Sequence, residues 1–217
     1  MAKCMPKSKE ISVEAWNSKV IEYAKLAEKH EVELFAPMNE PEVLFGPSAS
    51  ATWGQEILPM IREVYHGEIV WKGGAPGDMQ PDARNPNPTN FSGYDYLGVT
   101  LGVGSAPISL ENFIENIYNS MKVIHGFAER DGVKGVMITE FYGRLPGRWE
   151  ENAWTEEDEA RAHEIVLEKE KGKVVGFFAL DFLEMSCYGE ELPGVPNPEK
   201  SLPTQEVLKR YFTEILD

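Results

Sequence analysis

Apolar residues recur along the chain in two alternating patterns, one with helical spacing and one made of short continuous runs. After Ser12, a residue type that caps helix N-termini, apolar positions such as Val20 and Ala24 line one face, which predicts a helix over 13–29. The apolar run 33–38 follows directly and predicts a strand. A helix that is followed directly by a strand is typical of an α/β protein.

The same alternation continues to the end of the chain. Thr155, with Asp158 three residues later, resembles a capping box at the start of one of the later helices. The Pro-rich segment 73–94 predicts a long loop. Such a loop either has a function or is a packed surface loop that replaces a helix. Strands that alternate with helices indicate parallel strands and an α/β layer or barrel. The further predicted strands are 68–72, 96–101, 135–139 and 174–181, and the further helices are 53–65, 110–130, 156–171 and 205–216.

Length and composition narrow the classes of protein that this chain can represent. With 217 residues and 42% hydrophobic residues, we expect a single domain over 1–217. The formal net charge of −15 disfavours nucleic acid and anionic membrane surfaces as partners. The longest apolar runs are strand-sized, which argues against a membrane span. Cys4 and Cys187 are expected to be ordinary thiols, since two distant cysteines form neither a metal pair nor a disulfide framework.

Two glutamates directly follow predicted strands and are the candidate catalytic residues. Glu40 follows the run 33–38, and Glu140 follows 135–139. Parallel α/β folds place their active sites at the carboxyl ends of strands. Glycoside hydrolysis requires such a pair of carboxyl groups, one to protonate the leaving oxygen and one to attack or to activate water. A single glutamate at a strand end can also be a salt-bridged rim residue.

The residues around the two glutamates resemble those of a known family. Asn39-Glu40-Pro41, and Thr139-Glu140-Phe141-Tyr142-Gly143 later in the chain, are similar to the motifs of clan A retaining glycoside hydrolases. These are (β/α)8 barrel enzymes that include cellulases, β-mannanases and β-galactanases. The resemblance implies that Glu40 is the acid/base, Asn39 binds the sugar 2-hydroxyl and Glu140 is the nucleophile. It implies no cofactor and no metal.

The same resemblance assigns the chain to strands four to eight of a TIM (β/α)8 barrel, apparently without the first three βα units. A sheet of five open strands would expose an edge and apolar surface, so we expect a partner chain or self-association to complete the barrel. Two departures from the family pattern leave the substrate open. The end of strand six, 99–103, has no Tyr, and Leu180-Asp181-Phe182 stands where many members have a Trp.

Further residues are expected to contact an oligo- or polysaccharide substrate with β-linkages. Aromatic rings suit the apolar face of a pyranose, whereas Trp53, on a predicted helix, is expected in the core. Lys72, at the end of a strand, raises the alternative of a Schiff-base aldolase. A sugar-binding or incomplete barrel relative without activity is the other alternative. The predicted substrate-binding residues are Asn39, Trp71, Tyr142, Trp149 and Asp181.

Overall fold

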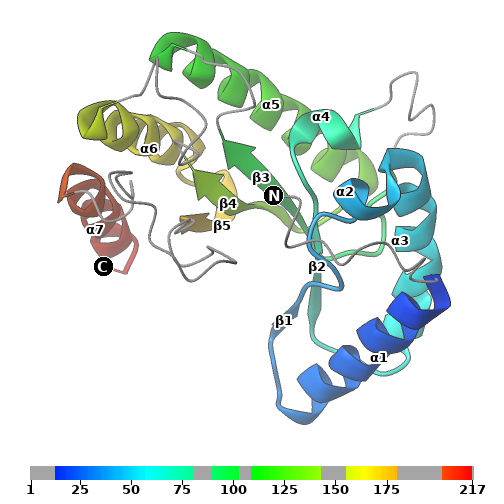
Figure 1. The fold of residues 1–217 in the computed structure, drawn as a ribbon. Coiled ribbons are helices and arrows are strands. Elements are labelled where there is room, and N and C mark those ends of the chain that lie inside the picture. Colours follow the sequence, from blue (N-terminus) through cyan, green and yellow to red (C-terminus); the bar gives the residue numbers. More distant parts are fainter. Residues whose placement is uncertain (1–12, 81–88, 103–108, 143–154, 180–201, 217) are drawn as a thin grey trace, which may run out of the picture. The chain divides into compact units, whose positions relative to one another are not determined.

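The computed structural model describes residues 13–80, 89–102, 109–142, 155–179 and 202–216 (Figure 1). The chain divides into two compact units, one with residues up to 98 and 127–135, and one with 99–126 and the residues from 136 onward. The first unit contains α1 (Val13–Lys29), β1 (Leu34–Phe35), α2 (Pro41–Phe45), α3 (Pro47–Arg62), β2 (Glu68–Lys72) and α4 (Pro76–Met79). The second contains β4 (Gly135–Tyr142), α6 (Glu156–Glu170), β5 (Val174–Ala179) and α7 (Leu202–Leu216). Residues of β3 (Tyr96–Gly102) and α5 (Leu110–Asp131) belong to both units.

The strands are parallel, and their order in the sheet, β1-β2-β3-β4-β5, is also their order along the chain. The pairings place Leu34 opposite Glu68, Trp71 opposite Leu97 and Ile138 opposite Phe177. Parallel neighbours in sequence order, joined by helices, have the topology of consecutive βα units in a (β/α)8 barrel. The predicted α/β class is therefore confirmed, with the topology of a partial barrel. The assignment to strands four to eight and the single domain remain predictions.

Three element boundaries near the first glutamate differ from the sequence-based prediction. The strand predicted over 33–38 is reduced to β1 and one further bridge between Asn39 and Lys72, because Pro37 has no N–H to donate to the ladder. The short helix α2 was not predicted at all. Helix α3 begins at Pro47, well before Trp53, because proline suits the first turn of a helix.

The core of the first unit is built around Trp71 of β2. Its indole ring packs against α3 at Gly54, where an added Cβ would overlap the ring. The ring of Tyr94 lies 5.4 Å away in an edge-on arrangement, and those of Phe91 and Trp53 lie 6.0 and 6.4 Å away. Aromatic rings at these separations attract one another beyond their burial of surface. The glycine in α3 thus permits the close approach that fixes Trp71.

The core of the second unit is built around Phe141 of β4, which is fully buried. Its ring contacts Phe113 of α5 at 6.2 Å, His163 of α6 at 4.6 Å and Phe177 of β5 at 5.6 Å. Phe141 therefore faces the helices. The pairing of β4 with β5 is irregular between Ile138 and Phe141, and Glu140 lies in this stretch.

Candidate active site

Glu40 lies just after β1, in a backbone conformation that is unusual for a residue with a side chain. Its φ of 47° and ψ of 60° place it in the left-handed region, where a residue with a Cβ is strained by about 1–3 kcal/mol. Its N–H donates to the carbonyl oxygen of Lys72 at 2.9 Å, and the preceding Asn39 bridges the same residue. The carboxyl end of β2 thus anchors the backbone of the predicted acid/base.

The side chains of Glu40 and Lys72 also meet. The Lys72 ammonium lies 3.8 Å from Glu40 Oε1, and the two side chains are only 11% and 23% exposed. At this distance the contact is an ion pair and not a hydrogen bond. Lys72, considered from the sequence for Schiff-base chemistry, is therefore a charge partner of the predicted acid/base.

Glu42 is a residue of this region that the sequence analysis missed. It lies in the first turn of α2, is 4% exposed, and accepts hydrogen bonds from Trp71 Nε1 at 3.1 Å and from the N–H of Gly74 at 3.3 Å. An acidic residue at the start of a helix ordinarily indicates no more than a favourable dipole interaction. Glu42 can be buried only because two N–H groups about thirty positions later in the chain bond to it. No pattern of residues near Glu42 in the sequence indicates these bonds.

The prediction that Trp71 contacts the substrate is wrong. Trp71 is 3% exposed, on the face of β2 that packs against α3. Its ring is enclosed by aromatic neighbours, and its indole N–H is bonded to Glu42. A ring held in this way offers no free face to a sugar, so Trp71 is a structural residue. The strand alternation that turns Lys72 toward Glu40 turns its neighbour toward the helix.

Glu140 lies near the carboxyl end of β4 and is half-buried. The preceding Thr139 ties this strand to β3, since its hydroxyl donates to the carbonyl oxygen of Val99 at 3.1 Å. The buried ring of Phe141 fixes the strand on the other side. Glu140 is thus held between two anchored neighbours. Tyr142, the last residue of β4, follows directly.

The predicted residues are therefore distributed over both units. The first unit brings together Asn39, Glu40 and Lys72, and the second carries Glu140 and Tyr142 on β4. Trp149 and Asp181 lie outside the described residues.

The described part of the chain contains no group of three or more His, Cys, Asp or Glu side chains that could hold a metal ion. Of the described helices, none is both long and apolar enough to cross a membrane.

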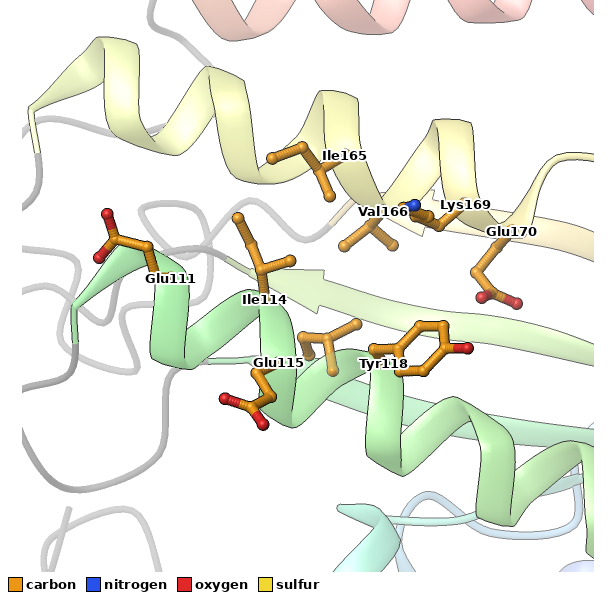
Figure 2. Close-up of a pocket in the computed structure, with 9 residues that line it drawn as sticks. Glu111, Ile114, Glu115, Tyr118, Ile165, Val166, Lys169 and Glu170 are labelled. Atoms are coloured by element: carbon orange, nitrogen blue, oxygen red, sulfur yellow. The ribbon is translucent and has the colours of Figure 1, made fainter.

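A hollow of about 380 Å³ lies between α5 and α6 of the second unit (Figure 2). Aliphatic side chains such as Ile114 and Ile165 form its walls, and Glu111 and Lys169 are among its charged residues. These two helices cover the face of β4 that carries Phe141. The residues that line the hollow come from α5 and α6, and neither candidate glutamate is among them.

No protein-family model and no curated protein matches the chain. Solved structures do match. A GH113 β-1,4-mannanase is similar over 98% of this chain and 67% of its own, with a TM-score of 0.62 and 17% identity. The GH113 β-mannanase of Alicyclobacillus acidocaldarius in complex with ManMIm matches 77% of this chain and 50% of its own, with a TM-score of 0.54 and 14% identity. The β-glucuronidase of Ruminococcus gnavus matches 78% of this chain and 29% of its own, with a TM-score of 0.57 and 16% identity.

These neighbours show that the chain has the fold of part of a TIM barrel. Over much of the chain, this fold is like that of the clan A glycoside hydrolases. The resemblance inferred from the two glutamate motifs is confirmed at the level of fold. The chain spans about half to two thirds of the length of the β-mannanase chains that it matches.

Proposed function

We propose that this chain carries the catalytic residues of a retaining glycoside hydrolase that acts on a β-linked oligo- or polysaccharide. The observation that carries the proposal is the placement of Glu40. It follows a parallel strand, in a strained left-handed conformation anchored by Lys72, in a chain with a clan A glycoside hydrolase-like fold. Strain of this kind gathers at functional sites.

In the proposed reaction Glu40 is the acid/base and Glu140 is the nucleophile. Glu40 donates a proton to the leaving oxygen while Glu140 attacks the anomeric carbon and forms a glycosyl-enzyme. Glu40 then takes a proton from the water that releases the sugar, and Asn39 binds the sugar 2-hydroxyl. Double displacement requires the two carboxyl groups to lie roughly 5–5.5 Å apart, whereas about 6.5–9.5 Å would correspond to inversion.

Azide rescue of two variants tests this proposal, because the two carboxylates have different roles. Glu140→Ala should abolish turnover, and azide should restore it by replacing the nucleophile, with a product of inverted anomeric configuration. Glu40→Ala should slow substrates with poor leaving groups far more than activated aryl glycosides, since only the former need the proton. Azide should then give a product of retained configuration, because it attacks the glycosyl-enzyme that Glu140 still forms.

The control is Glu129→Ala, which removes an exposed carboxylate of α5 and should leave every rate unchanged. Near-normal turnover of all β-glycosides by both active-site variants would refute the catalytic assignment.

The alternative is a sugar-binding relative without activity. In that case calorimetry would detect saturable binding of β-linked oligosaccharides, while the protein as isolated would not hydrolyse them.

A further inference from the structure

A buried carboxylate lies two residues after the proposed acid/base. Glu42 is 4% exposed, and its two carboxylate oxygens accept N–H groups from Trp71 at 3.1 Å and from Gly74 at 3.3 Å. A carboxylate removed from water is costly unless it is hydrogen-bonded, and donors held in place repay part of that cost. An apolar side chain at this position would leave both N–H groups without an acceptor.

The two bonds lie on either side, along the chain, of the backbone bond between Glu40 and Lys72. The N–H of Glu40 donates to the carbonyl of Lys72, and the donors to Glu42 are the residue before Lys72 and the residue two after it. The turn that starts α2 and the end of β2 are therefore joined at three points. Three hydrogen bonds between the same two short segments restrict the backbone angles of Glu40.

One of the two donors is held rigidly. The indole of Trp71 lies against Gly54 and among the rings of Phe91 and Tyr94. Tyr94 is fixed in turn, because its hydroxyl donates to the carbonyl of Gly54 at 2.7 Å. An N–H group on such a ring cannot follow Glu42 if the turn moves, so the bond resists displacement of α2.

We propose that Glu42 is a positioning residue that holds Glu40 in its left-handed conformation, in which the carboxyl group serves as acid/base. The inference rests on the proposed function and extends it to a residue outside the family motifs. Without the bonds from Glu42, the strain at Glu40 favours relaxation of the turn. A carboxyl group displaced by about 1 Å transfers its proton far less well.

The decisive variant is Glu42→Gln, which keeps the shape of the side chain. A glutamine has one acceptor oxygen, so its amide group must face either the indole N–H or the N–H of Gly74. We expect kcat for substrates with poor leaving groups to fall about 10- to 100-fold, with KM and the rates on activated aryl glycosides nearly unchanged. Glu56→Gln, on the exposed face of α3, makes the same change of charge and should alter neither.

A second variant isolates the bond to Trp71. Trp71→Phe removes the indole N–H and keeps an aromatic ring in the core. It should lower kcat for poor leaving groups in the same direction but less than Glu42→Gln does. Both changes weaken one linkage between α2 and β2, so the loss in the double variant should be smaller than the sum of the two single losses. Fully additive effects would contradict a shared link.

A crystal structure of Glu42→Gln separates the failure of this inference from the failure of the proposed function. If Glu40 leaves the left-handed region, the positioning role holds even where no glycoside is turned over. If Glu40 keeps its φ and the ratio of rates on the two kinds of substrate is unchanged while only Tm falls, Glu42 serves stability alone and the inference is overturned. Absence of turnover in the parent protein bears on the enzyme assignment alone and leaves this structural comparison in force.

Discussion

Asp95 is a residue on which several polar contacts of the first unit converge. Its carboxylate receives Arg62 Nη2 at 2.5 Å, Lys134 Nζ at 2.9 Å and the N–H of Ile69 at 2.7 Å, and its side chain is 13% exposed. Burial by itself would raise the pKa of Asp95, but the hydrogen bonds from Arg62, Lys134 and Ile69 hold that pKa well below its usual range. The ionised form is therefore the one that stabilises the fold.

This depressed pKa gives a pH-dependent prediction for Asp95→Asn. The unfolded chain binds a proton at Asp95 near pH 3.9, and the folded protein binds it only at lower pH. The stabilisation is thus complete above about pH 5 and is lost as the pH falls through the folded pKa. We expect the variant to lose about 2 kcal/mol of unfolding free energy at pH 7, and the deficit to shrink below about pH 4.

Urea denaturation across this pH range measures the effect. Glu63→Gln, at an exposed position after α3, should show no comparable trend. A deficit of Asp95→Asn that is equal at every pH would mean that packing and not charge is responsible.

The sequence predicted both candidate catalytic glutamates near strand ends, although Glu140 lies inside β4 and does not follow it, and it did not predict the role of Glu42. Glu40 and Glu140 each follow a short apolar run, and the rule that parallel strands carry active sites at their carboxyl ends needs no tertiary information. The carboxylate of Glu42 is bonded to residues 29 and 32 positions away. Contacts at that separation depend on how β2 lies beside β1, which no local pattern records. The prediction for Trp71 was wrong for a related reason, because an aromatic residue suits a sugar site and a protein core equally well.

At the scale of elements, α6 begins with a reciprocal cap that the sequence did reveal. The N–H of Asp158 donates to Thr155 Oγ1 at 3.1 Å, and the N–H of Thr155 donates to Asp158 Oδ2 at 3.0 Å. The predicted capping box is confirmed. It satisfies N–H groups that a helix start otherwise leaves without partners.

Thr155→Ala removes one half of this cap. We expect a loss of about 1 kcal/mol in unfolding free energy, because one N–H at the start of α6 loses its acceptor. Thr155→Ser retains a hydroxyl group and should stay near the parent value. The midpoint of urea denaturation checks both, and an unchanged midpoint for Thr155→Ala would show that water replaces the cap without loss.

Regular elements with strong periodicity were predicted closely, and elements shaped by proline were not. The helix over 13–29 and the strand over 68–72 have the predicted bounds. Around Glu40 the outcome differs, because Pro37 shortens a strand and Pro41 and Pro47 each start a helix. Proline acts through its missing N–H and its fixed φ. The spacing of apolar residues therefore does not predict where a proline ends a strand or starts a helix.

At the scale of the whole molecule, β5 is the last strand in the order of the sheet among the residues that the structure describes. Two of its apolar side chains are exposed, Val175 at 56% and Phe178 at 53%. An edge strand with exposed apolar side chains favours pairing with another segment.

We therefore predict that the chain associates, either with further βα units or with copies of itself. Light scattering should detect species larger than 24.4 kDa, and a dye for apolar surface should bind the residual monomer. Val175→Glu should weaken the association, because it places a charge on the edge strand. Tyr118→Glu, at a side chain that is 55% exposed on α5, should not. A monodisperse monomer without dye binding would contradict the prediction.

The left-handed backbone at Glu40 also bears on how this protein can change over evolutionary time. Glycine adopts that conformation without strain, and asparagine does so more readily than glutamate. Either residue would relieve the backbone strain at this position. A lineage released from selection for chemistry should therefore drift toward glycine or asparagine here wherever Lys72, which loses its ion pair with Glu40, also changes. Among distant descendants of this gene, the identity of this single codon would separate those still selected for acid/base chemistry from those that kept only the scaffold.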